Sequence, residues 1–398
     1  MTSAEETATL AALKDSADHA LRSGDPRRAR ELFQRALNLA PRRIELHMGL
    51  AACERALGDL EASLASVEGA LAIEPRFFPA LLMKGSLLEA LGRTTAAATL
   101  YGVATKLAPP LDSLAEPTRR ALTHAREVHD RHAADLAASL RAEAGLEDVS
   151  PTTALGRKAD IFIEAMAGRR KIFHQEPVQF HYPGLPAIEF HERSQFPWLE
   201  ALEARTEAIR AEVLSVWSDG SPGLEPYVSY PPGAPVDQWA DLNHSLDWTA
   251  YHLWFYGERV EQHCQKCPET VAALEMVDQP HIRGRSPAAM FSILKPRTRI
   301  PPHTGVSNAR LVVHLPLIVP DGCAFRVGGE TRPWREGEAW VFDDTIEHEA
   351  WNDSGLPRAI LICDCWAPTL SDEERELICR LTAALDRFQG GPVTGEGL

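Results

Sequence analysis

A period of 34 residues runs through the first third of the chain and constrains its fold more than any other feature. Three glycines follow this period, at Gly24, Gly58 and Gly92. Three further columns keep the same register: Ala36, Ala70 and Ala104; Pro41, Pro75 and Pro109; and Ala17, Ala51 and Gly85. Four columns in register over three repeats favour a stack of like units over a helical bundle with accidental periodicity.

This pattern resembles the tetratricopeptide repeat, a helix–turn–helix unit of the same length. The small residues let paired helices approach closely, the glycines fall in the turn inside each pair, and the prolines end the second helix. We therefore expect residues 1–110 to form an α-helical superhelix. Such a groove commonly holds a peptide or protein segment, but a spacer or an oligomer contact is an equal alternative.

The segment 111–155 has helical spacing with one charged face, which predicts a connecting or capping helix and a linker. The run LEDVSPTTALGRK then breaks the helical pattern. We accordingly expect a second domain over residues 156–398, ending in a C-terminal helix. The chain as a whole is predicted to be a multidomain α + β protein.

The overall composition excludes some classes of partner. The formal net charge is −15, which argues against a nucleic acid because phosphate binding needs a basic surface. The sequence shows neither a secretory signal nor an apolar run of membrane-spanning length.

Seven scattered cysteines fit a reducing compartment, so we expect a cytoplasmic protein. We interpret Cys264 and Cys267 as free thiols or an incidental disulfide rather than a zinc site. The oligomeric state is open.

Short apolar runs separated by turns follow from about residue 172, which predicts a β-sandwich or barrel. In the run RLVVHLPL, His314 shares a face with Arg310, because side chains alternate along a strand. Arg358 likewise shares a face with Asp364. A His and an Arg inside a barrel are costly unless they meet an anion or a hydrogen-bond partner. An ordinary satisfied core histidine is the simpler interpretation of His314 taken alone.

The motifs PHTG, NARL, HLPLIVP, FDDTIEHEAWN and R-x₃-L together resemble the aspartyl/asparaginyl β-hydroxylase family. The resemblance runs from about residue 248 to 368. It implies a double-stranded β-helix, or jelly roll, that works as an oxidoreductase: an oxygenase using Fe(II), 2-oxoglutarate as cosubstrate and O₂. Longer members of the family also carry tetratricopeptide-like repeats ahead of this domain.

The resemblance also assigns roles to single residues. His303 and His348 are the expected iron ligands and catalytic residues, and imidazole suits iron(II). Ser292, His314 and Arg358 are the expected 2-oxoglutarate contacts, with Arg358 gripping the distal carboxylate. A buried His and Arg on the strands would thus serve a buried anion.

Two positions depart from related oxygenase sites. The usual third ligand is a carboxylate two residues after the first His, and Gly305 stands there. The resembled family shares this gap, whereas a small residue there makes a halogenase a weak alternative. Val312 stands where some members carry an Arg, so contacts of that Arg do not transfer. Asp343, Asp344 and Glu347 either orient His348 or are acidic turn residues.

We therefore expect a dioxygenase that hydroxylates the β-carbon of Asp or Asn residues, in a peptide or protein held partly by the repeats. One alternative is hydroxylation of a small molecule or a carrier-bound amino acid. A second is a repeat and β-barrel scaffold without catalysis. The site residues needed for chemistry are all present, which disfavours the scaffold. The substrate and the stereochemistry are open.

Overall fold

The computed structural model describes residues 3–150, 153–217 and 222–391. Contacts divide the chain into two units, residues 1–170 and residues 171–398. Each unit has its own hydrophobic core. Within the described residues, no helix combines the length and the apolar character that crossing a membrane requires.

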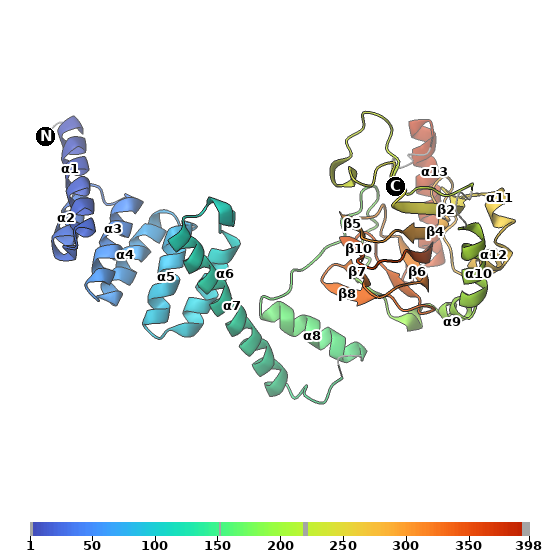
Figure 1. Ribbon diagram of the computed structural model, residues 1–398, viewed down its shortest axis with the longest axis horizontal. Helices are drawn as coiled ribbons and strands as arrows, with labels where there is room; N and C mark the ends of the chain where they lie inside the picture. Colours follow the sequence, from blue (N-terminus) through green and yellow to red (C-terminus); the bar gives the residue numbers. More distant parts are fainter. Residues whose placement is uncertain (1–2, 151–152, 218–221, 392–398) are drawn as a thin grey trace. The chain divides into compact units, whose positions relative to one another are not determined.

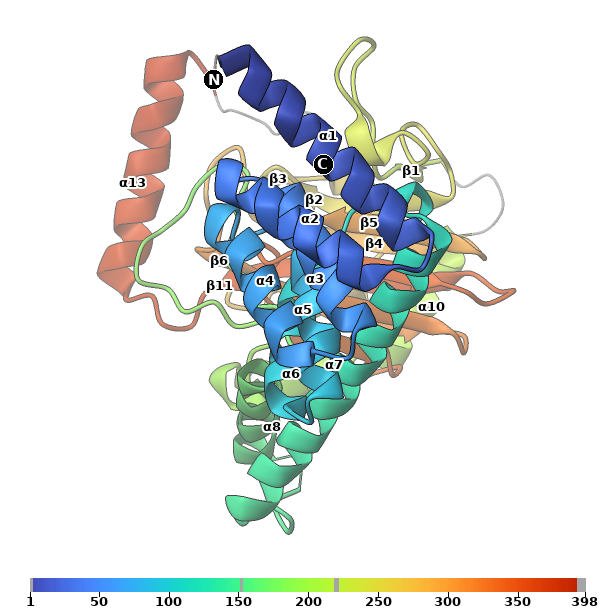
Figure 2. The same cartoon turned by 90° about the vertical axis from the view of Figure 1, so that its left-hand side faces the viewer.

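The first unit is the predicted repeat array, which is confirmed. Its paired helices stack in order along the unit (Figures 1 and 2). They are α1 Ser3–Arg22, α2 Pro26–Leu39, α3 Ile44–Ala56, α4 Leu60–Ile73, α5 Phe78–Ala90 and α6 Thr94–Lys106. The backbone of Gly58 turns between α3 and α4 with φ +80°, a conformation that glycine adopts without strain. Gly85 lies against Tyr101 so closely that a Cβ there would meet the ring at 2.3 Å.

Two further helices close the first unit. Helix α7 (Glu116–Glu143) packs against α6, and α8 (Ala154–Met166) packs against α7. The sequence placed residues 156–170 with the second domain, whereas contacts place them with the repeats. The reason is a small apolar cluster in which Ile163 and Ala167 cover Ala137 of α7.

The second unit is built on two antiparallel sheets. The larger has the order β1-β2-β4-β11-β6-β9, with β3 beside β2, and the smaller has the order β5-β10-β7-β8. The strands of the larger sheet are β1 Glu225–Pro226, β2 Trp248–Phe255, β3 Glu258–Arg259, β4 Ala289–Leu294, β6 Arg310–Ile318, β9 Trp340–Phe342 and β11 Arg358–Trp366. Those of the smaller are β5 Thr298–His303, β7 Cys323–Val327, β8 Glu330–Pro333 and β10 His348–Asn352. From β4 onward the chain passes back and forth between the sheets, which is the strand order of the expected double-stranded β-helix.

The two faces of the larger sheet serve two cores. On β6, Val313 and Leu315 face a core shared with helices, while Val312 faces a core between the sheets with Phe325 of β7. This alternation is the predicted period of two. The helices of this unit are α9 Leu199–Glu203, α10 Thr206–Val216, α11 Glu261–Cys264, α12 Pro268–Leu274 and α13 Asp372–Gln389. All seven cysteines are free thiols, Cys264 and Cys267 included.

Candidate active site

A cavity of about 780 Å³ opens between the two sheets of the second unit. All five residues that the sequence singled out line it: Ser292, His303, His314, His348 and Arg358. They come from five different strands, β4, β5, β6, β10 and β11. Strand register, and not closeness in sequence, therefore brings the five predicted residues into one cavity.

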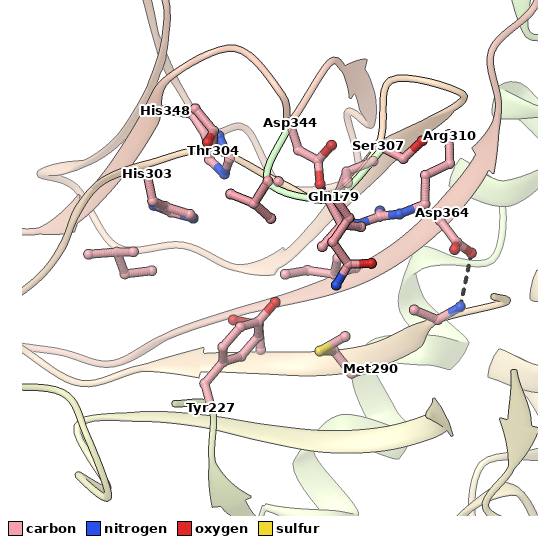
Figure 3. Close-up of a pocket in the computed structure, with 18 of the residues that line it drawn as sticks. Gln179, Tyr227, Met290, His303, Thr304, Ser307, Arg310, Asp344, His348 and Asp364 are labelled. Carbon is pink, nitrogen blue, oxygen red and sulfur yellow. Dashed lines mark hydrogen bonds and ion pairs between the residues drawn. The ribbon is translucent and has the colours of Figure 1, made fainter. Parts of the chain in front are cut away.

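His303 and His348 lie opposite each other where β5 pairs with β10. Their ring centroids are 4.0 Å apart, and Figure 3 shows the two rings side by side. The Nδ1 of His303 bonds the carbonyl of Pro301 at 2.8 Å, and that of His348 bonds the carbonyl of Ile346 at 3.0 Å. A carbonyl can only accept, so Nδ1 carries the proton in both rings and Nε2 keeps its lone pair.

Burial also keeps both imidazoles neutral. It lowers the pKa of His348 to about 4 and the pKa of His303 well below its usual value, where the neighbouring His348 adds to the effect. A neutral imidazole with a free Nε2 is the form that binds a metal. Two such rings side by side therefore fit a divalent metal. Among the described residues, no group of three His, Cys, Asp or Glu side chains could hold one.

A carboxylate from the turn between β9 and β10 fills the space beside Gly305. A Cβ at Gly305 would lie 2.0 Å from Oδ2 of Asp344. The same Oδ2 accepts a hydrogen bond from Arg310 at 3.1 Å. Asp344 is buried, with 6% of its surface exposed. Burial raises its pKa and Arg310 opposes this.

The other acidic neighbours of His348 have partners of their own. Asp343 accepts hydrogen bonds from Gln175 and from Thr345, so it shapes the turn. Glu347 accepts one from Arg326 at 2.9 Å. A backbone carbonyl, and not an acidic side chain, orients the ring of His348. Asp343 is therefore interpreted as an acidic turn residue.

The deep end of the cavity holds an uncompensated cation. Arg358 is 1% exposed, and its Nε and Nη1 have no hydrogen-bond partner. Its guanidinium lies 4.8 Å from the ring centre of Trp334. Burial lowers the pKa of Arg358 to about 10. A buried guanidinium with free N–H groups is a ready receptor for a carboxylate.

Ser292 and His314 complete this end. The hydroxyl of Ser292 accepts a hydrogen bond from the indole of Trp248 at 3.0 Å. The Nδ1 of His314 is buried without a partner. Burial and the charge of Arg358 hold the pKa of His314 well below its usual value. A neutral His314 can donate to an anion in the same pocket, so the arrangement fits the predicted 2-oxoglutarate contacts.

Sequence reasoning missed an aromatic wall beside the metal-binding pair. Trp239 stands with its ring centre 4.9 Å from that of His303. Trp248 stacks on Tyr227 at 3.7 Å. No motif marked Tyr227 or Trp239, because both come from a loop-rich segment between β1 and β2. Trp239 therefore covers part of the His303 ring, and Trp248 packs against Trp239 with their ring centres 6.0 Å apart.

Sequence reasoning also noted Arg310 and Asp364 only as neighbours on strand faces. In the structure Asp364 accepts hydrogen bonds from Ser286 at 2.7 Å and from the backbone of Ala288 at 3.0 Å. The charge of Arg310 opposes the effect of burial, which raises the pKa of Asp364. Figure 3 shows Arg310 and Asp364 on the opposite side of the pocket from the histidines, with Asp344 between.

Comparison with known proteins gives two family matches. Residues 203–368 match the model of the family described as aspartyl/asparaginyl beta-hydroxylase, and residues 20–75 match a tetratricopeptide repeat model. Human aspartyl/asparaginyl beta-hydroxylase is 37% identical over 179 residues, 44% of this chain and 22% of that protein. The ornithine lipid ester-linked acyl 2-hydroxylase of Rhizobium tropici is 33% identical over 199 residues, 49% of this chain and 66% of that protein. The match thus spans about a fifth of the human relative.

Among solved structures, the repeats resemble the Yersinia enterocolitica type III secretion chaperone SycD, bound there to a peptide of the translocator YopD. The identity is 19%, the TM-score is 0.28, and the match covers 31% of this chain and 91% of that one.

Proposed function

We propose that the chain is an iron(II)- and 2-oxoglutarate-dependent dioxygenase, because residues 203–368 match the aspartyl/asparaginyl β-hydroxylase family model and follow tetratricopeptide repeats. Its target is the β-carbon of an Asp or Asn residue. One observation carries the proposal: two neutral imidazoles with free Nε2 atoms share a cavity with a buried, unpaired Arg358.

Each residue has a distinct task in this proposal. His303 and His348 would hold iron(II), which supplies activation of O₂ coupled to decarboxylation of 2-oxoglutarate. Arg358 takes the distal carboxylate of the cosubstrate, because its free N–H groups can form two parallel bonds to it. His314 and the Ser292 hydroxyl fix the cosubstrate further by hydrogen bonds. The aromatic wall of Trp239 and Trp248 keeps water from the reacting carbon.

The decisive experiment measures succinate and product together. The purified chain receives iron(II), 2-oxoglutarate, O₂ and an extract of cellular peptides. Mass spectrometry then looks for a gain of about 16 Da on Asp or Asn. The matched control is the His348→Ala chain. Succinate and modified peptide should both depend on His348; modification by the variant at an undiminished rate would refute the proposal.

We further propose that the repeats hold part of a peptide or protein substrate. Binding energy from a remote segment supplies what a single small side chain cannot, and a tether raises the effective concentration of the target residue. The truncation that tests this removes residues 1–170, because α7 packs on α6 and α8 packs on α7, so both helices belong to the first unit. Residues 171–398 should keep iron and 2-oxoglutarate binding, and should modify the peptide with a higher KM. An unchanged kcat/KM would make the repeats a spacer or an oligomer contact.

A second candidate, a small-molecule substrate, has one specific observation in its favour. Val312, Met290 and Ile362 line the cavity with apolar surface, and a Rhizobium tropici relative is named for hydroxylation of a lipid acyl chain. Under this alternative residues 171–398 alone would retain full kcat/KM on the native substrate.

We place the protein in a reducing, cytoplasmic compartment, a proposal that seven free thiols support.

A further inference from the structure

The inventory of cations around the cavity limits what its substrate can be. Within the described part of the chain, three arginines and no lysine line the cavity. Arg285 pairs with both oxygens of Asp386, at 2.8 and 2.6 Å. Arg310 pairs with Asp344 at 3.1 Å. Arg358 is left without a partner, and the proposed function uses it for 2-oxoglutarate. Among the described side chains, none therefore remains as a free cation for a carboxylate on the substrate.

Arg310 already serves more than one carboxylate. Besides its hydrogen bond to Asp344, its charge acts on Asp364, whose own hydrogen bonds come from Ser286 and Ala288. All three charged side chains line the same cavity. A third carboxylate brought next to this single guanidinium would be a buried charge without a counter-ion, which is strongly unfavourable.

Asp344 also has an acceptor to offer. Its Oδ2 is taken by Arg310, but its Oδ1 is buried and has no hydrogen-bond partner. The side chain lines the cavity, and Figure 3 shows it between His348 and Arg310. A buried acceptor without a donor costs free energy. A substrate that brings an N–H group to this oxygen removes that cost.

We infer that the site takes asparagine rather than aspartate as its target side chain. This inference rests on the proposed function and narrows it. A neutral side-chain amide presents one N–H donor to Oδ1 of Asp344. Its carbonyl accepts from Arg310, which has five N–H groups and gives one to Asp344. An aspartate carboxylate of the same shape has no donor for Asp344 and adds the third negative charge.

Two capped amino acids test this inference, because they differ only in the amide and the carboxylate. The probes are N-acetyl-asparagine amide and N-acetyl-aspartate amide. Isothermal titration calorimetry measures their binding to the full chain at pH 7 with iron(II) and 2-oxoglutarate under nitrogen, so that no turnover occurs. The asparagine compound should bind at least about tenfold more tightly, the size expected for one hydrogen bond to a charged group.

Two variants separate this contact from general charge. Asp344→Asn removes the carboxylate beside Arg310, so the aspartate compound should gain affinity and the preference should reverse. Glu176→Gln removes one carboxylate from the exposed rim of the cavity and should leave the ratio of the two affinities unchanged. The wild-type measurement stands by itself if the first variant fails to fold.

The outcomes distinguish this inference from the proposed function beneath it. Equal binding of the two compounds, or tighter binding of the aspartate compound, overturns the preference for asparagine and leaves the hydroxylase proposal intact. Failure of both compounds to bind overturns the inference, because the pocket by itself then recognises neither side chain, and it leaves the proposed function to the test with peptides described above. If Glu176→Gln changes the preference for asparagine as much as Asp344→Asn does, the preference arises from net charge. That outcome would refute the role of Asp344.

Discussion

Replacing Arg358 with Met should stabilise the second unit in the absence of cosubstrate and abolish its response to 2-oxoglutarate. Burial lowers the pKa of Arg358 to about 10. A pKa lowered by one corresponds to about 1.36 kcal/mol of free energy. The buried cation therefore destabilises the ligand-free fold by roughly 3 kcal/mol. The variant loses the contact with Trp334, worth about 1 kcal/mol. Met fills similar space, which leaves a net gain of roughly 2 kcal/mol.

Urea unfolding followed by tryptophan fluorescence measures this gain for the second unit alone, because all nine tryptophans lie in residues 171–398. The wild-type chain should gain about 2.7 kcal/mol when 2-oxoglutarate is present at a hundred times its dissociation constant. The Arg358→Met chain should gain nothing. Both sets of curves are measured with the same metal content.

Arg310→Met is the matched control, since it removes an arginine that has a partner. It leaves Asp344 buried without a counter-ion, which should cost about 3–5 kcal/mol. The two arginine variants should thus shift the unfolding midpoint in opposite directions. A ligand-free Arg358→Met chain that is less stable than wild type would refute the argument from an unpaired buried charge. A variant still stabilised by 2-oxoglutarate would remove Arg358 from the cosubstrate site.

Three further changes have defined outcomes. His303→Ala or His348→Ala should each abolish binding of iron(II) measured by anaerobic calorimetry, and unchanged affinity in either variant would refute the ligand pair. Gly305→Ala should lower the free energy of unfolding by about 1–3 kcal/mol, because the new Cβ would lie 2.0 Å from the Asp344 carboxylate. The control Gly355→Ala should lower it far less, because a Cβ there has nothing within 4 Å. Equal losses in the two variants would contradict the crowding at Gly305. Burial lowers the pKa of His348 to about 4 in the folded chain, below its value in the unfolded chain. The free energy of unfolding of the metal-free chain should therefore fall by about 3 kcal/mol as pH drops from about 6.5 to 4. A His348→Asn chain whose stability depends on pH in the same way would refute this contribution.

Several features of the fold could be predicted because they repeat along the sequence. The interval between Gly24, Gly58 and Gly92 indicated helix pairs, since each unit repeats the same local packing. Alternation along residues 310–317 correctly separated the face of His314 from that of Leu315. The boundary after the repeats could not be predicted as well, because α8 is held by apolar contacts with α7 that no periodic pattern marks.

The candidate site divides in the same way. The positions of His303, His348 and Arg358 followed from motifs, and the cavity brings all three together. Their protonation and their partners did not follow. Arg310 meets Asp344, whereas Arg358 meets no carboxylate among the residues that the structure describes. This difference depends on how β6, β9 and β11 pair, and strand pairing joins residues far apart in the chain.

A family resemblance pointed to the candidate site residues, and the sequence alone determined which face of each strand presents its side chains. It did so because helix and strand periods are local properties of the backbone. Only the tertiary structure decided which charges compensate one another. Compensation depends on distances of a few ångströms between segments such as residues 310 and 344, and on burial that removes water from between them. The acceptor left open on Asp344 and the cation left open at Arg358 belong to this second kind of information.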